Sequence, residues 1–63
     1  MQKNLRKVKY LRKQKNMTLN EIAEKTKLSV GYLSNIENCK RTPSLDTLDK
    51  IACALGIDIV DFF

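Results

Sequence analysis

The side chains of this 63-residue chain that could do chemistry are hydroxyls and carboxamides, and they are concentrated in residues 29–38. The members of this cluster are Ser29, Tyr32, Ser34, Asn35 and Asn38. Such groups donate and accept hydrogen bonds, and a carboxamide can do both toward one partner. With no histidine and only two cysteines, no nucleophile and general base can be named and no four-ligand zinc site can be built. The pattern predicts recognition through hydrogen bonds, not an enzyme, with no metal and no cofactor.

Two helix starts position this cluster. Thr18 and Glu21 have the spacing of a capping box, in which each side chain accepts a hydrogen bond from the backbone of the other. Met17 and Ile22 flank the box and can pack on each other as a hydrophobic staple. The same pattern of cap and flanking apolar residues recurs at Ser29. Because the cap at Ser29 follows the cap at Thr18 so closely, the helix that begins after Thr18 must be short. A turn must separate it from the helix that begins after Ser29.

The apolar periodicity of the rest of the chain is helical throughout, and no segment alternates as a strand would. Leu5, Val8 and Leu11 form the apolar stripe of a first helix, and Gly56 ends a fourth. The helices expected are residues 2–15, 19–26, 30–37, 45–55 and 59–63. The sequence therefore predicts one all-α domain over residues 1–63, with a helix-turn-helix unit at residues 19–38.

The net charge of +5 is unevenly distributed along the chain. A basic N-terminal segment contains Lys3, Arg6, Lys7, Lys9, Arg12, Lys13 and Lys15, with no acidic residue in between. Residues 44–63 are mostly acidic in their charged positions. Alone, such a segment is typical of a solvated helix face. Beside a helix-turn-helix, it favours a surface that neutralises phosphates and releases counterions.

The ordered set of residues resembles the helix-turn-helix domain of the lambda-repressor-like (XRE) family. Within the unit at 19–38, the buried positions of the family pattern are filled by Ile22, Ala23, Leu28, Leu33 and Ile36. Outside it, the likeness extends to Arg12, Ile36-Glu37-Asn38, Lys40-Arg41-Thr42-Pro43-Ser44-Leu45, Ala52 and Leu55-Gly56-Ile57. The resemblance covers roughly Leu5 to Phe62. It implies a five-helix DNA-binding domain that acts as a sequence-specific transcriptional regulator, more often a repressor than an activator.

In this family the helix that corresponds to residues 30–37 lies in the major groove of double-stranded DNA, and the resemblance implies the same here. Carried over residue by residue, the base contacts fall on Val30, Gly31 and Asn35. Asn35 suits adenine, because a carboxamide donates and accepts together there, and Val30 suits a thymine methyl. Gly31 either lets the backbone approach the DNA closely or is a tolerated first-turn glycine. Tyr32 is either partly buried or contacts the DNA through its hydroxyl.

Contacts to the DNA backbone or at the rim of the groove are implied for a larger set. Its members are Thr18, Asn20, Ser29, Tyr32, Ser34, Asn38, Lys40 and Arg41. Many family members have Gln where this chain has Leu19, so a phosphate contact is lost there or is made by Asn20. Thr18 and Ser29 are helix caps first, and any phosphate contact is secondary.

Arg12 and Glu37 match a family pair that bridges the first helix to the end of the third; the alternative is two exposed charges that never meet. Lys27 and Cys39 occupy positions where the family commonly has Gly, which implies strained left-handed backbone at both. For Cys39 a tolerated substitution is favoured over a redox switch. Cys53 is expected at the core or its edge.

As partners, the resemblance implies a palindromic DNA operator and a homodimer, with Val60, Phe62 and Phe63 offering the apolar surface for pairing. The alternative function is a protein-interaction module, such as an antitoxin or a coactivator-like adaptor on the same fold. No apolar run approaches the roughly 18 residues of a membrane span and no leader is evident, so a cytoplasmic protein with reduced thiols is expected. The apolar end of the chain suggests a downstream domain that is absent.

Overall fold

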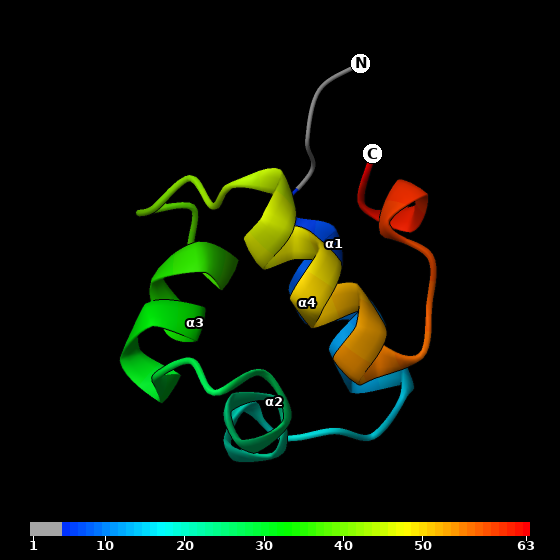
Figure 1. The fold of residues 1–63 in the computed structure, drawn as a ribbon, viewed down its shortest axis with the longest axis horizontal. Coiled ribbons are helices and arrows are strands. Elements are labelled where there is room, and N and C mark those ends of the chain that lie inside the picture. Colours follow the sequence, from blue (N-terminus) through cyan, green and yellow to red (C-terminus); the bar gives the residue numbers. More distant parts are fainter. Residues whose placement is uncertain (1–4) are drawn as a thin grey trace.

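The computed structural model describes residues 5–63, which form four α-helices and a terminal 3-10 helix (Figure 1). The elements are α1 (Arg6–Gln14), α2 (Leu19–Thr26), α3 (Val30–Glu37), α4 (Leu45–Leu55) and η1 (Ile59–Phe62). No strand occurs among the described residues, and the expected all-α class is confirmed. None of these helices is long and apolar enough to cross a membrane.

The bounds of α2, α3 and α4 coincide with the helices expected from the sequence, whereas the first and last elements differ. Within the described residues α1 begins at Arg6 and ends at Gln14; the expected start at residue 2 lies outside them. The last element is not an α-helix. Its backbone N–H groups bond three residues back, Asp61 to the Asp58 carbonyl at 2.9 Å and Phe63 to the Val60 carbonyl at 3.1 Å. Short helical pieces of this kind often take the tighter 3-10 turn.

Side-chain caps fix the starts of the three central helices. The backbone N–H of Glu21 donates to Thr18 Oγ1 at 3.1 Å, and that of Thr18 donates to Glu21 Oε1 at 3.0 Å, so the capping box is complete. The N–H of Tyr32 donates to Ser29 Oγ at 3.0 Å. Ser44 caps α4 in the same way. Each cap satisfies a donor that the first helical turn would otherwise leave unpaired.

The turn between α2 and α3 is left-handed at Lys27, with φ of 63°. The side chain of Thr26 stabilises this turn through hydrogen bonds. Its hydroxyl donates to the Ile22 carbonyl at 2.7 Å and lies 3.3 Å from the N–H of Leu28, which can donate to it. Asn16 and Cys39 also have positive φ, at 56° and 61°. Three of the connections therefore use left-handed residues other than glycine, which costs conformational strain at each.

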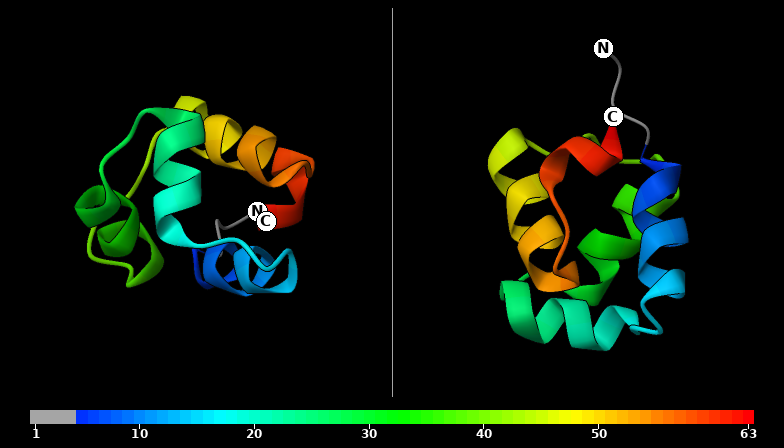
Figure 2. Two further views of the ribbon diagram at one scale, coloured as in Figure 1. Left: turned by 90° about the horizontal axis from the view of Figure 1, so that it is seen from below. Right: turned by 90° about the vertical axis from the view of Figure 1, so that its right-hand side faces the viewer.

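α1 and α4 lie in two layers on either side of the core, and α2 runs between them at one end, as the two views of Figure 2 make clear. α2 packs against both α3 and α4, while η1 packs against α1 and α4. Every element contributes to the core, which consists of Val8, Ile22, Leu33, Ile36, Leu48, Ile51, Ala52, Leu55 and Phe62. The helix-turn-helix pair is thus supported by the rest of the domain on one side only, and the outer side of α3 stays open (Figure 1).

Two expectations about burial are wrong. Cys53 is exposed, because on α4 it lies one residue beyond the buried Ala52 and so about 100° around the helix. Phe62 has no exposed surface at all, since the 3-10 turn directs it into the core. Phe62 therefore cannot offer surface for dimerisation. Val60, at 53% exposure, and the half-buried Phe63 can.

Candidate nucleic-acid interface

The amphipathic pattern of α3 decides which of its side chains are open. Leu33, Ile36 and Glu37 are buried on the inner side. On the outer side, Val30 is 39% exposed and Gly31 is exposed with no atom near the position of a Cβ. The first turn of α3 thus presents a small, weakly polar surface next to the unpaired N–H groups of a helix N-terminus, which can approach another molecule closely.

Asn35 lies one turn further along α3 and organises the loop that follows. Its backbone carbonyl accepts hydrogen bonds from the N–H of Lys40 at 2.8 Å and of Arg41 at 3.3 Å. Its side-chain amide has no hydrogen-bond partner among residues 5–63 and remains free to donate and accept. The backbone of Asn35 therefore fixes the loop, while its side chain is available for recognition.

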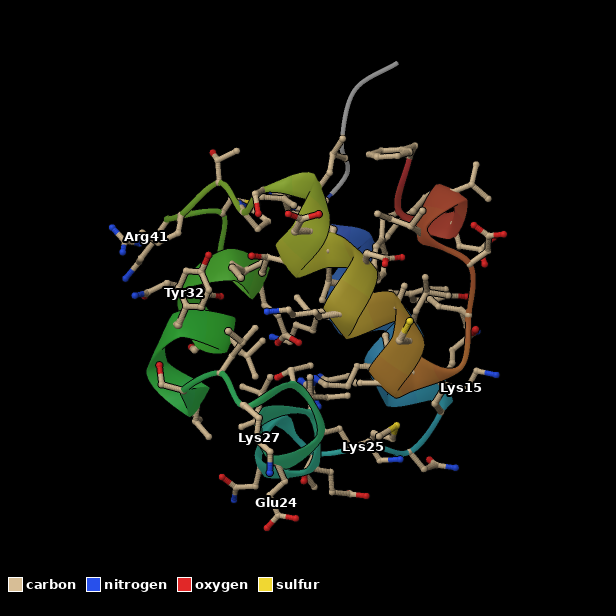
Figure 3. All side chains as sticks on the ribbon, viewed as in Figure 1. Lys15, Glu24, Lys25, Lys27, Tyr32 and Arg41 are labelled. Atoms are coloured by element: carbon tan, nitrogen blue, oxygen red, sulfur yellow. The ribbon has the colours of Figure 1, made fainter. Side chains whose placement is uncertain are left out.

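Two pairs of predicted site residues meet directly. The Asn38 side-chain amide donates to Ser34 Oγ at 3.4 Å, a weak contact along the last turn of α3. The Arg41 guanidinium lies over the ring of Tyr32, 5.8 Å from its centroid. Figure 3 shows both of these side chains on the outer side of α3, pointing away from α4. Tyr32 is half-buried and Arg41 is exposed.

An ion pair between Arg12 and Glu37 joins α1 to the buried side of α3. Arg12 Nε donates to Glu37 Oε2 at 2.7 Å and Nη2 donates to Oε1 at 3.1 Å. The two side chains are 12% and 4% exposed, respectively. This is the ion pair that the sequence resemblance implies, and it is the one salt bridge found within the described residues. Its charged groups are satisfied internally, so Arg12 is not free to contact phosphate.

The basic N-terminal segment does not form one face. The Lys7 ammonium donates to the carbonyl of Phe63 at 3.0 Å. Lys15 projects on the side opposite Tyr32 and Arg41 (Figure 3). Lys3 lies outside the described residues. Two residues of the segment, Arg6 and Lys9, lie beside the end of α3. There they line a hollow of about 340 Å³ together with Glu37, Asn38 and Cys39. Only part of the segment is therefore placed near the candidate interface.

The remaining predicted site residues are all exposed: Thr18 and Asn20 at the start of α2, Ser29 at the start of α3, and Lys40 in the following loop. The hydroxyls of Thr18 and Ser29 are already occupied as caps. Sequence reasoning missed the cation–π contact between Arg41 and Tyr32 and the hydrogen bonds of Thr26 in the turn. Residues 32 and 41 lie on different elements, so no helical spacing signals their contact. Among residues 5–63, no group of three potential metal ligands lies together.

The family model described as "Helix-turn-helix" matches residues 8–62 of the chain. This chain belongs to the lambda-repressor-like (XRE) helix-turn-helix family. The family is made up of DNA-binding transcription regulators.

Individual relatives agree with this membership. The chain is 44% identical over 52 residues to the Immunity repressor protein of Bacillus phage phi105, covering 82% of this chain and 36% of the relative. It is 41% identical over 58 residues to the Control protein C.MunI of Mycoplasma sp, covering 90% and 78%. The crystal structure of the restriction-modification controller protein C.AhdI from Aeromonas hydrophila superposes with a TM-score of 0.89 at 27% identity, covering 94% of this chain and 89% of that one.

The relatives differ in how much lies beyond the shared domain. The chain spans little more than a third of the length of the phage repressor, whereas it spans most of the control protein and of the crystallised controller protein. The shared part in each case includes the helix-turn-helix, and this is the part to which the family membership applies.

Proposed function

We propose that this domain binds double-stranded DNA in a sequence-specific manner as a transcriptional regulator, acting as a repressor, with α3 inserted into the major groove. The observation that carries the proposal is the outer surface of α3. It combines an open first turn at Val30 and Gly31 with the half-buried Asn35, whose carboxamide has no hydrogen-bond partner among residues 5–63. A groove-inserting helix needs small residues where it approaches closely and a polar group aimed at the base edges.

This placement supports the following assignment of contacts. Val30, Gly31 and Asn35 face the bases, with Asn35 donating and accepting at adenine. Contacts to phosphates and at the rim come from the flanking polar and basic groups: Thr18, Asn20, Ser29, Tyr32, Ser34, Asn38, Lys40 and Arg41. These positioning contacts supply affinity without sequence information. The outer face of α3 carries no acidic side chain, which favours DNA over a protein partner of the antitoxin or adaptor type.

The decisive experiment is selection from a random duplex library, with wild type and with Asn35→Ala, at two salt concentrations. The alanine variant keeps its backbone carbonyl, so the hydrogen bonds that hold residues 40 and 41 remain. We expect it to lose about 1–3 kcal/mol of preference at one base position in each half-site, with the salt dependence unchanged.

Asn38→Ala is the matched control, because it removes the same carboxamide from a rim position. It should weaken binding to all sequences alike and leave the preferred sequence as it is. If wild type enriches no sequence, and all binding disappears as salt rises, the regulator proposal is wrong. A protein partner then becomes the better hypothesis for this fold.

We further infer a homodimer that reads a palindrome, with half-sites about one helical turn, roughly 34 Å, apart. The apolar surface of Val60 and Phe63 supports this pairing, and the buried Phe62 takes no part in it. A regulator of this kind works where the DNA is, so we place it in the cytoplasm.

A further inference from the structure

The cation–π contact between Arg41 and Tyr32 is an arrangement that the DNA contacts implied by the sequence do not explain. A guanidinium on an exposed loop usually either pairs with a carboxylate or moves freely in solvent. Within residues 5–63, Arg41 pairs with no carboxylate, and its contact is with the face of the Tyr32 ring, 5.8 Å from the centroid. The backbone of Tyr32 is held in the first turn of α3 by the Ser29 cap, and its ring is half-buried.

This cation–π contact leaves the N–H donors of the guanidinium unoccupied. Within residues 5–63, the Arg41 side chain has no hydrogen bond and no ion pair, and the donors of a guanidinium lie in its plane. These donors form a fork that matches two oxygens of a phosphate. The backbone N–H of Arg41 is also bonded to the Asn35 carbonyl, so both ends of the residue are held against α3.

We propose that Tyr32 is a positioning residue, which holds the Arg41 guanidinium ready to bind one DNA backbone phosphate in a bidentate manner. The inference rests on the proposed DNA-binding function and adds to it a coupling between the two residues. The phosphate contact is made by Arg41, and Tyr32 acts at the rim of the groove through Arg41 and not through a contact of its own. The role of Tyr32 is to reduce the number of conformations that Arg41 loses on binding, which is the benefit of a preorganised contact.

The test is a double-mutant cycle in which affinity for a short duplex is measured as a function of salt. Because a phosphate contact is independent of sequence, the duplex can be the selected one or one of arbitrary sequence at low salt. Arg41→Ala should lower the slope of log affinity against log salt by about 0.9, the value for one lost phosphate contact. Lys50→Ala, which removes a charge on α4, is the matched control and should leave this slope unchanged.

Tyr32→Leu should weaken binding about two- to fivefold in the presence of Arg41, the range expected from losing one exposed cation–π contact. It should have no further effect when Arg41 is already alanine. Tyr32→Phe keeps the ring and removes the hydroxyl, so its coupling to Arg41 should survive. Circular dichroism and thermal unfolding identify any variant whose affinity falls because α3 is disrupted.

Three outcomes would overturn the inference. Tyr32→Leu and Arg41→Ala could weaken binding independently, so that their effects multiply. Tyr32→Phe could behave as Tyr32→Leu does, which would assign the contact to the hydroxyl itself. Wild type could bind no duplex at any salt concentration, in which case the proposed function fails as well. If a sequence is selected but the two effects multiply, the proposed function stands and only the coupling is wrong.

Discussion

Arg12 and Glu37 join α1 to the end of α3 through a pair of hydrogen bonds, Nε to Oε2 at 2.7 Å and Nη2 to Oε1 at 3.1 Å. The remaining terminal nitrogen of Arg12, Nη1, donates to the Met17 carbonyl at 2.8 Å, in the segment just before α2. One guanidinium thus connects α1, the start of the helix-turn-helix and the end of α3. We expect the angle at which α3 is presented to depend on this contact.

Replacing only one member of this pair should destabilise the domain more than replacing both. Glu37→Ala leaves the Arg12 charge in a largely buried site, and we expect unfolding in urea to show a loss of about 3–5 kcal/mol. Replacing both residues by methionine should cost clearly less, because no unpaired charge is left behind. Glu37→Gln, which keeps one acceptor, is the milder variant for a domain whose total stability is small. If the losses of Arg12→Met and of Glu37→Met simply add in the double methionine variant, the two residues are not coupled and the bridge does not hold α3.

The two glycines should respond to alanine in opposite directions. Gly56 has φ of +73°, so Gly56→Ala should destabilise the domain by about 1 kcal/mol through backbone strain alone, since nothing crowds its Cβ position. Gly31 is helical and its Cβ position is equally open, so Gly31→Ala should stabilise by about 0.5–1 kcal/mol. Thermal unfolding of the two variants measures both effects.

The same Gly31 variant decides between the two interpretations of that residue. If the backbone approaches DNA closely, the added methyl weakens binding although the free domain has become more stable. If Gly31 is only a tolerated first-turn residue, affinity is unchanged. Measuring stability and duplex affinity on the same preparation separates the two.

The three serine and threonine caps provide a matched set. Thr18→Ala, Ser29→Ala and Ser44→Ala each remove a hydroxyl that accepts a first-turn N–H, and each should cost about 1 kcal/mol in urea unfolding. Only Thr18 and Ser29 are assigned to the DNA backbone. An affinity loss in those two variants beyond that of Ser44→Ala would be a phosphate contact. Equal affinity in all three would mean that the hydroxyls serve as caps alone.

What could be predicted from the sequence depended on local chemistry. The starts of α2, α3 and α4 were predictable because a cap and its N–H donor lie within one helical turn. The left-handed backbone at Lys27 and Cys39 followed from non-glycine residues in positions where the family has glycine. The pairing of Arg12 with Glu37 depended on the family resemblance, since nothing local joins residues so far apart.

What could not be predicted depended on the path of the chain in space. The contact between Tyr32 and Arg41 exists because the Asn35 carbonyl binds the N–H of Lys40 and of Arg41 and turns the loop back along α3. Backbone hydrogen bonds of this kind leave no pattern in the sequence. Burial of Cys53 was predicted wrongly for a related reason. A small apolar residue next to the buried stripe of a helix can lie either in the core or in solvent, and the sequence does not decide between them.

Phe62 and Val60 should have opposite effects on folding and on pairing. Phe62→Ala removes a fully buried ring from the core and should destabilise the domain by about 3–5 kcal/mol, because a cavity replaces it. Val60→Lys changes an exposed side chain, so unfolding in urea should be nearly unaffected, while the added charge should weaken self-association. Sedimentation velocity over a range of concentrations measures the second effect. If the lysine variant associates as wild type does, the dimer forms through another surface, and a wild type that stays monomeric throughout would remove the dimer from the proposal. A Phe62→Ala variant as stable as wild type would mean instead that the 3-10 turn rearranges to fill the space, so that burial of this ring contributes little to stability.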